Sequence, residues 1–531
     1  MEFDHFQALW YIALKIFMEE GEMAALESQD RTIAGTGEVS KWLFWTCFIA
    51  LIATSFGFII RANIIGDLGV AFNLSETQKG EILGVGLWPF ALSIVLFSLI
   101  IDKIGYGRAL AFAFICHVAS AFVTIFATGY QMLYWGTFIL AVGNGTVEAV
   151  INPVVATVYS KQKTKWLNIL HAGWPGGMVL GGLMILILMP GLDWRWKVGL
   201  VLIPAVIYAL MMIRAKFPVH ERVKAGISYK AMLQEAGVIG AVIIIVIMIA
   251  EIGRIFQWPL GAKIIVAAVL ILAYSLYVRK LGHPLFIFLL LIMLPLATTE
   301  LGTDSWITEL VNPVMAKMGM QAGWVLIYTA FIMMVLRFLA GPIIHKLSPL
   351  GLLAVCSGIA VVGLVMLSQV TGIMIFIAAT VYALGKTFFW PTMLGVAAER
   401  FPRGGALTLN AIGGMGMLSV GVIGAVFLGN IQDRQIDREL LAQHPALHTQ
   451  VVAQEKASLF GKYQPVDKER VAALSEGEQK IVADTTATAK KNALMTVAIF
   501  PAIMLVCYLI LIMYFRAKGG YKPVELVAQR E

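Results

Sequence analysis

The stretch Gly143–Pro153 reads GNGTVEAVINP and places one glutamate and two asparagines inside a largely apolar segment. Asn144, Glu148 and Asn152 are each four residues apart, so an α-helix brings them toward one face. The surrounding run, 131–158, is long enough to cross the ~30 Å hydrocarbon core of a membrane as a helix. Because an ionisable residue at that depth is costly, Glu148 is expected to be functional.

The composition of the whole chain is that of a membrane protein. Of its 531 residues, 59% are hydrophobic and only 14% are charged, and the mean hydropathy is +0.82. A soluble domain carries about 25% charged residues, so the composition excludes a soluble enzyme. The formal net charge of +8 comes from short loops rather than from one basic face, so we expect no nucleic-acid partner. The four cysteines lie in separate apolar runs, and we expect no disulfide, metal site or cofactor.

Apolar runs of helical length recur along nearly the whole chain and predict about 14 transmembrane helices. A first block of six occupies 41–214, with spans near 42–65, 80–101, 109–127, 131–158, 167–189 and 198–214. A basic segment and two extra spans, near 237–256 and 260–278, occupy 215–283. A second block of six occupies 284–514, with spans near 284–308, 322–344, 350–368, 372–398, 406–428 and 493–514. The fold class is therefore an all-α polytopic membrane protein.

The orientation follows from the loops, because lysine and arginine accumulate on the cytoplasmic side of a membrane. Loops after the even-numbered spans carry most of these residues, among them Lys103 and Arg108. This side is predicted to be cytoplasmic, which places the tails 1–40 and 515–531 inside. The polar segment 430–491 then lies outside, either as a small cap or as a solvated insertion.

An internal repeat relates the two blocks of six spans. Four landmarks of the first block recur in the second at separations of 238 to 243 positions: 78–80 in 321–323, 102–105 in 345–348, 152–153 in 390–391, and 167–168 in 409–410. A nearly constant separation indicates two parallel six-helix halves.

Three stretches resemble the major facilitator superfamily. Asp102–Arg108 (DKIGYGR) is similar to the family's conserved loop of acidic, glycine and basic residues, and Arg337–Pro342 (RFLAGP) is its weaker echo. Gly143–Pro153, followed by Leu167–Trp174 (LNILHAGW), resembles the fourth and fifth helices of the fucose permease branch. The resemblance implies two six-helix halves, here with two extra helices between them, and transport of a small solute by alternating access. It also implies gating roles, at the cytoplasmic ends of the helices, for Asp102, Arg108 and Arg337.

The resemblance implies proton coupling through Glu148. In the fucose permease branch, the glutamate of a Glu-x-x-x-Asn-Pro signature is a protonation site, and Glu148 occupies that position. A carboxyl group in an apolar cavity favours its neutral form, so it can bind and release a proton as access alternates. Asp304 or Glu300 is expected to be a second coupling carboxylate.

The repeat makes the other charges inside the spans interpretable. Arg61 corresponds to Asp304 at a separation of 243 positions, and Glu148 corresponds to Lys386 at a separation of 238. In this family the helices concerned line the central cavity, so the four charges are expected to face one another across it. They are interpreted either as buried ion pairs that hold the halves together or as contacts made and broken during transport. Glu251 and Arg254, one turn apart in an extra span, are interpreted as a local structural pair.

The first span departs from the fucose permease pattern. That branch carries an acidic residue there, whereas residues 58–63 of this chain read FIIRAN. The arginine, Arg61, could bind a carboxylate or phosphate through two hydrogen bonds, which favours an organic anion or sugar acid as substrate. Alternatively, Arg61 is an internal counter-ion for Glu148.

These residues predict a secondary transporter, not an enzyme, for a sugar or sugar derivative, coupled to protons. The predicted substrate-binding residues suit a hydroxylated solute: Arg61, Asn63, Asn144, Asn152, Asn168, His171, Lys386 and Trp390. We expect a monomer in a plasma membrane, the inner membrane of a bacterium. Two alternatives stay open: an organic-anion transporter that uses Arg61, and a non-transporting sensor or assembly subunit whose partner protein binds the extra helices or the 430–491 loop.

Overall fold

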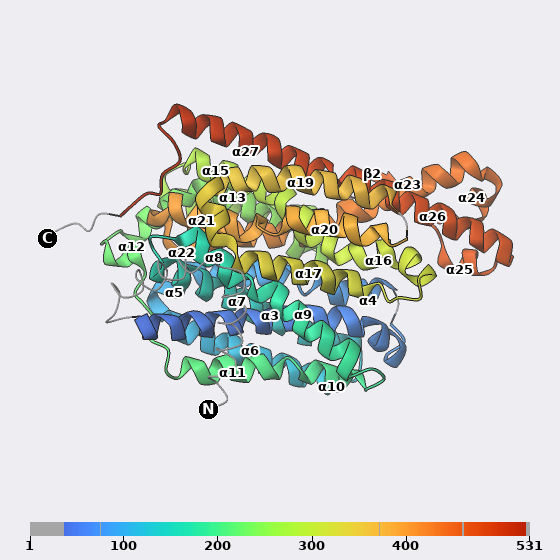
Figure 1. Cartoon of the computed structure of the whole chain (residues 1–531), viewed down its shortest axis with the longest axis horizontal. Coiled ribbons are helices and arrows are strands. Elements are labelled where there is room, and N and C mark those ends of the chain that lie inside the picture. The colour runs from blue at the N-terminus through green and yellow to red at the C-terminus, as the bar shows by residue number, and fades with distance from the viewer. Residues whose placement is uncertain (1–36, 75, 371, 459–460, 527–531) are drawn as a thin grey trace.

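The computed structural model describes residues 37–526 except 75, 371 and 459–460. The predicted N-terminal tail, 1–40, and the end of the C-terminal tail therefore lie largely outside the described residues. Within the described part, 13 helices are long and apolar enough to cross a membrane, or 14 when a bent pair is counted as one span. The helices run side by side along the long axis of the molecule (Figure 1), which confirms the predicted all-α polytopic fold.

The first six spans form one helical bundle around α7 (Tyr130–Val158). The other spans are α3 (Gly37–Ala71), α4 (Glu76–Gly84) with α5 (Trp88–Ile104), α6 (Tyr106–Ile125), α8 (Lys163–His171) with α9 (Gly173–Leu183) and the π-helix η1 (Met184–Leu188), and α10 (Trp194–Gly199) with α11 (Leu202–Met212). Helix α7 packs against α3, α5, α6 and α8. Its segment from Gly143 to Ala156 is buried throughout, so Glu148 lies in the middle of the protein.

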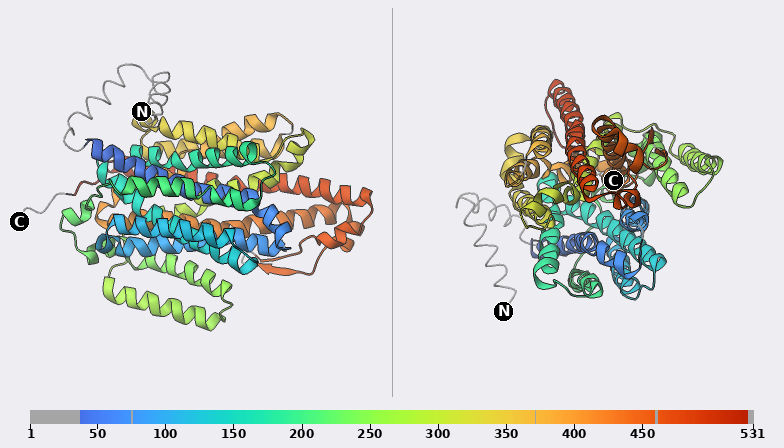
Figure 2. Two further views of the ribbon diagram at one scale, coloured as in Figure 1. Left: turned by 90° about the horizontal axis from the view of Figure 1, so that it is seen from below. Right: turned by 90° about the vertical axis from the view of Figure 1, so that its right-hand side faces the viewer.

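Two extra helices lie at the side of the bundle, after the short helix α12 (Glu221–Lys224). Helix α13 (Tyr229–Ile255) packs against α5 and the second half, whereas α14 (Leu260–Val278) packs on α13 and exposes an apolar surface. They are the two light-green helices at the lower edge of the left view in Figure 2. Arg254 donates hydrogen bonds of 2.9 and 2.7 Å to Glu251, which confirms the predicted local pair.

The second half repeats the six-span arrangement. Its elements are α15 (Pro284–Ala297), the π-helix η2 (Thr298–Gly302), α16 (Thr303–Lys317), α17 (Gly323–Phe338), α18 (Ala340–Leu347), α19 (Pro349–Gln369), α20 (Met374–Lys386), α21 (Phe389–Arg400), η3 (Pro402–Gly404), α22 (Gly405–Leu418), the π-helix η4 (Ser419–Gly424), α23 (Ala425–Gln443) and α27 (Ile499–Ala517). Two spans are interrupted: α17 and α18 meet at an angle of 68°, and α20 is separated from α21 by Thr387 and Phe388. Both interruptions lie near the second half's buried charges.

The segment 430–491 forms a helical extension with its own core. It contains the end of α23, α24 (Pro445–Val451), a hairpin of β1 (Lys456–Ser458) and β2 (Gly461–Tyr463), α25 (Lys468–Ala472) and most of α26 (Glu476–Val497). Its buried apolar residues are Ile436, Leu440, Leu447, Val451, Val482 and Ala489. The extension projects from the end of the molecule opposite to α12 and the C-terminus (Figure 1). The segment is therefore folded, and we call it the cap.

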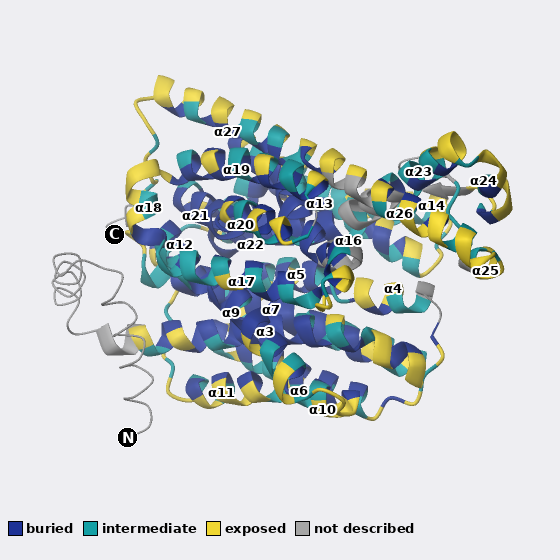
Figure 3. Cartoon of the chain, turned by 45° about the vertical axis from the view of Figure 1, so that its right-hand side comes forward, coloured by how far each residue is buried: buried dark blue, intermediate teal, exposed yellow. Residues whose placement is uncertain are grey.

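Burial follows the arrangement of the halves. Buried residues concentrate on the central helices, such as α3, α7 and α9, whereas exposed residues gather on outer helices such as α11 and α27 (Figure 3). Many of the exposed side chains are large and apolar, including Ile115, Phe122 and Ile264. An apolar outer surface around a polar-containing centre is the distribution that a lipid bilayer requires.

Candidate functional site

The two halves meet most extensively where α9 packs on α17, α8 on α21, and α5 on α22. Six ionisable residues, all at most 7% exposed, lie buried where the halves meet: Glu148 and His171 from the first half, and Glu300, Asp304, Arg337 and Lys386 from the second. We call this set the central cluster. Charges that are excluded from water to this degree need partners, so their contacts decide what the site can do.

Glu148 and His171 form the part of the central cluster that belongs to the first half. Asn152 donates a hydrogen bond of 2.5 Å from Nδ2 to Glu148 Oε2, and His171 Nε2 lies 3.6 Å from the same oxygen. His171 Nδ1 lies 2.9 Å from the carbonyl oxygen of Leu167. A carbonyl only accepts, so Nδ1 carries the hydrogen, and a neutral His171 presents an unprotonated Nε2 to Glu148. His171 Nε2 and Glu148 Oε2 are then both acceptors. When one of them binds a proton, it becomes a donor and the contact becomes attractive.

An ion pair occupies the break between α20 and α21. Arg337 donates from Nε to the Thr387 carbonyl oxygen, at 2.6 Å, and from Nη2 to Glu300 Oε1, at 2.7 Å. The Trp390 backbone N–H donates to Glu300 Oε2 at 3.0 Å. A broken helix leaves unsatisfied carbonyls at one end and N–H groups at the other, and this pair provides partners for both. The carboxylate of Glu300 also lies at the positive end of α21.

Arg337 also connects the two halves. Its Nη1 atom donates a hydrogen bond of 2.9 Å to the carbonyl oxygen of His171. Lys386 forms an ion pair with Asp304 and lies 5.2 Å from the centre of the Tyr382 ring. Both cations of the central cluster are thus paired with carboxylates of their own half. Glu148 faces His171 and Asn152 instead.

The structure brings most of the predicted residues together. Glu148, Asn152, His171, Glu300, Asp304 and Lys386 all make contacts in the central cluster, and Trp390 joins it through its backbone. Asn168 lies beside it and donates hydrogen bonds to the Thr164 carbonyl, at 2.9 Å, and across the interface to Thr392 Oγ1, at 3.1 Å. Their roles in binding or coupling stay predictions.

Two predicted asparagines point elsewhere. Asn144 Oδ1 lies 3.0 Å from His117 Nε2, and His117 Nδ1 lies 3.1 Å from the Tyr208 hydroxyl, all inside the first half. Successive residues of a helix are rotated by about 100°, so positions 144 and 152 differ by about 80° and only the latter reaches Glu148. Asn63 donates to the Ile59 carbonyl oxygen of its own helix, at 2.8 Å.

The expectation that four charges face one another is wrong for Arg61. Its side chain lines a pocket inside the first half, and Asp304 pairs with Lys386 of its own half. The physical reason is a difference between the repeats. Asp304 follows the π-helix η2, which rotates the following residues relative to a regular α-helix, whereas α3 is a regular α-helix throughout.

The predicted gating residues are dispersed. Asp102 forms an ion pair with Arg222 of the segment between the halves, and Arg108 is exposed on α6. Arg337 lies in the central cluster rather than in a cytoplasmic loop, because α17 continues to Phe338 before the chain bends. Any gating role of Arg337 therefore depends on its contact with His171.

Sequence reasoning missed the contact that joins the halves at the predicted cytoplasmic end. Glu399 Oε1 accepts hydrogen bonds from the Thr164 backbone N–H, at 3.2 Å, and hydroxyl, at 2.5 Å, and Lys163 donates to the Ala398 carbonyl oxygen at 3.2 Å. Tyr521 donates to Glu399 Oε2 at 2.8 Å. A threonine and a glutamate at helix ends are ordinary loop-facing residues, so no pattern in the sequence distinguishes them.

Two helical halves around a buried charged cluster are the architecture of a secondary transporter. The chain belongs to the Major Facilitator Superfamily, whose family model matches residues 46–425. Its fold is similar to that of the human organic anion transporter MFSD10, with a TM-score of 0.57, 11% identity and coverage of 88% of this chain and 99% of the other. It is also similar to the fucose:proton symporter FucP of E. coli, with a TM-score of 0.51, 14% identity and coverage of 87% and 98%.

One curated relative matches part of the chain. The Protein TsgA homolog of Buchnera aphidicola subsp. Schizaphis graminum (strain Sg) is 24% identical over 181 residues, which are 34% of this chain and 47% of the relative. The chain thus spans about half the length of that relative. At identities of 11 to 24%, these similarities show the fold alone.

Proposed function

We propose that this chain is a proton-coupled transporter that moves a small uncharged polar solute, a sugar or sugar derivative, by alternating access. The charge balance of the central cluster carries the proposal. Arg337 pairs with Glu300 and Lys386 pairs with Asp304, which leaves Glu148 opposite His171. One proton on the Glu148–His171 pair makes the whole cluster neutral. The similarity to a fucose:proton symporter supports the same reading.

The coupling step follows from that balance. When the halves close around the cluster, an unbalanced negative charge is costly in the low-dielectric interior, whereas the protonated cluster has no net charge. The halves therefore exchange access most readily with the proton bound. Asn152 holds the Glu148 carboxyl group in place through its hydrogen bond of 2.5 Å. We place the protein in a plasma membrane with both tails cytoplasmic.

The test uses proteoliposomes that contain the purified chain. A thermal-shift screen of neutral sugars, deoxysugars, uronic and sialic acids and small organic acids first selects the solute, because a bound ligand stabilises the native state by mass action. Glu148→Gln should then abolish uptake driven by a pH gradient but retain counterflow, because glutamine resembles the protonated carboxyl group. Glu251→Gln, at a buried carboxylate outside the cluster, is the control and should retain both. Gradient-driven uptake at the wild-type rate in Glu148→Gln would contradict the proposal.

An organic anion is the second candidate substrate, suggested by the similarity to MFSD10. Both cations of the cluster are paired, so an anion would have to displace Glu300 or Asp304 from its partner. A screen in which only anions stabilise the protein would favour this candidate. The non-transporting alternative predicts instead a stoichiometric partner that co-purifies through the extra helices or the cap.

A further inference from the structure

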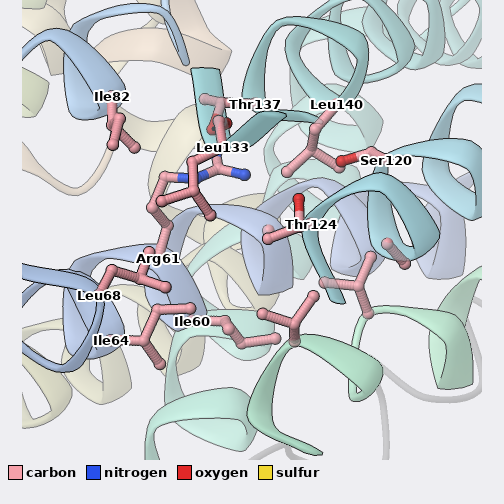
Figure 4. A pocket seen from close by; sticks show the side chains of 14 residues that line it. Ile60, Arg61, Ile64, Leu68, Ile82, Ser120, Thr124, Leu133, Thr137 and Leu140 are labelled. Carbon is pink, nitrogen blue, oxygen red and sulfur yellow. Dashed lines mark hydrogen bonds between the residues drawn. The ribbon is translucent and has the colours of Figure 1, made fainter. Parts of the chain in front are cut away.

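A second polar site lies inside the first half, away from the central cluster. Arg61 is about 30 Å along α3 from Lys41, the first residue of its span, at 1.5 Å per residue. It therefore lies near the end of the bundle that is predicted to be extracytoplasmic. Its side chain enters a pocket between α3, α4, α6, α7 and the residues around α10 and α11. Figure 4 shows the Arg61 side chain extending toward Thr137, with Thr124 beside the same space.

Two hydrogen-bond donors in this pocket have no partner among the residues that the structure describes. Arg61 makes no hydrogen bond or ion pair there. The Thr124 side chain is 6% exposed, and its hydroxyl has no hydrogen-bond partner. A buried hydroxyl without a partner is unfavourable, and the half-buried Arg61 guanidinium has no counter-charge beside it, so both groups point to an occupant.

The neighbouring hydroxyls already donate their hydrogens elsewhere, so Arg61 and Thr124 are the donors that remain for the occupant. Ser120 donates its hydroxyl hydrogen to the Gly136 carbonyl oxygen, at 2.6 Å, and Thr137 donates to that of Leu133, at 2.8 Å. The other lining residues are glycine, alanine and aliphatic side chains, among them Ile60, Ile64, Leu68, Ile82, Leu133 and Leu140. No carboxylate lines the pocket within the described residues, so nothing there neutralises the guanidinium.

Two described acidic residues at this end of the first half have other partners. Asp67 accepts a hydrogen bond of 2.9 Å from Lys197, and Glu81 accepts one of 2.5 Å from the Tyr130 hydroxyl. The positive charge of Arg61 is thus left for a ligand that brings its own negative charge. The cavity volume of about 20 Å³ limits the size of that ligand, because a single water molecule needs roughly 10 to 15 Å³ of the same measure.

We propose that this pocket binds one small monovalent anion, of the size of chloride, between the guanidinium of Arg61 and the hydroxyl of Thr124. The anion neutralises a charge inside the first half and ties α3 to α6. A sugar or a phosphate group is too large for the cavity, so this site is separate from the proposed transport site.

The test measures thermal unfolding of the full chain in detergent at constant pH and ionic strength while chloride replaces gluconate. The wild type should show a saturable rise in melting temperature, and bromide should reproduce it. Arg61→Gln should abolish the rise. Arg195→Gln removes an exposed arginine that pairs with Asp193, and this variant should keep it.

Each outcome decides the proposal. A saturable rise of the same size in Arg61→Gln would overturn it, and so would the lack of any saturable rise in the wild type, which would leave water as the occupant. If Arg61→Gln does not fold, Thr124→Val provides the test, because it removes only the hydroxyl. The proposal predicts that Thr124→Val raises the half-saturating chloride concentration roughly fivefold, the effect of one hydrogen bond. An unchanged concentration in that variant would also overturn it.

Discussion

His171 Nε2 lies 3.6 Å from Glu148 Oε2, and the opposite ring nitrogen is held by the Leu167 carbonyl oxygen at 2.9 Å. The second contact fixes which nitrogen carries the hydrogen of the neutral ring. The unprotonated Nε2 atom therefore faces Glu148, and the contact between them strengthens when either side chain binds a proton. The same His171 contributes its own carbonyl oxygen to Arg337 of the other half. The proposed proton site and the interface between the halves therefore share one residue.

The Arg337–Glu300 pair should be essential for stability. Arg337→Gln leaves the buried Glu300 carboxylate without its cation, so the free energy of unfolding should fall by about 3 to 5 kcal/mol. Chemical unfolding in detergent measures this change. The double variant Arg337→Gln with Glu300→Gln should lose less than the sum of the single losses, because neither charge is then left alone. Arg195→Gln, whose side chain and partner Asp193 are both about half exposed, is the control and should change little. Additive losses would show that the two side chains do not interact.

The contact between Thr164 and Glu399 should control closure at the predicted cytoplasmic end. Glu399→Gln replaces an oxygen that accepts two hydrogen bonds from Thr164, so the closed arrangement should lose stability. A cysteine introduced next to this contact reports on closure through its reaction with a water-soluble maleimide. This cysteine should react several-fold faster in the protein that carries Glu399→Gln than in the protein that keeps Glu399. Equal labelling rates would argue against a closing role.

Tyr521 should contribute to the same closure from the C-terminal tail. Its hydroxyl donates to Glu399 Oε2 at 2.8 Å, and burial together with this carboxylate raises the pKa of Tyr521 well above its usual range. Tyr521→Phe removes one hydrogen bond and should increase the maleimide labelling less than Glu399→Gln does. Tyr514→Phe, on the exposed face of α27, is a matched control that should leave labelling unchanged.

Acidification should destabilise the segment between the halves through His220. Burial lowers the pKa of His220 from 6.5 to about 4, and its Nδ1 atom accepts a hydrogen bond of 3.1 Å from the Arg222 backbone N–H at the start of α12. The depressed pKa means that the unfolded chain binds the proton more tightly. The neutral His220 therefore contributes up to about 3 kcal/mol to the free energy of unfolding. This contribution is fully present above pH 6.5 and is lost as the pH falls toward 4.

The comparison of His220→Asn with the wild type measures this effect. Asparagine keeps the capping acceptor but does not titrate. The melting temperature of the variant should therefore fall less between pH 7 and pH 5 than that of the wild type. His345→Asn, at an exposed histidine, should follow the wild type. An unchanged pH dependence in His220→Asn would assign the acid sensitivity to other groups.

Sequence patterns predicted the fold well, because membrane spanning imposes one requirement that every span must meet. Apolar length alone locates α7 or α19, and the repeat relates the two halves without any knowledge of contacts. The hairpin of β1 and β2 in the cap was not expected, since it lies in a polar segment where no membrane constrains the chain.

The site was only partly predictable. Glu148 and Lys386 were found because a charge in an apolar run is conspicuous, and His171 because it lies beside landmarks of the internal repeat. Arg337 was predicted only to gate the cytoplasmic ends of the helices, because the break between α20 and α21, which it bridges, leaves no trace in the apolar pattern. The wrong placement of Arg61 opposite Asp304 has a similar origin. The π-helix η2 rotates the side chains that follow it, and the sequence pattern gives no sign of this rotation.

Infrared difference spectroscopy of a pH titration tests the central claim, proton binding by the Glu148–His171 pair, without a known substrate. The wild type should show either a carboxylic C=O band or an imidazolium ring band that titrates, and Glu148→Gln should lose it while Glu251→Gln keeps it. A titrating band that persists unchanged in Glu148→Gln, or the lack of any such band in the wild type, would contradict the account.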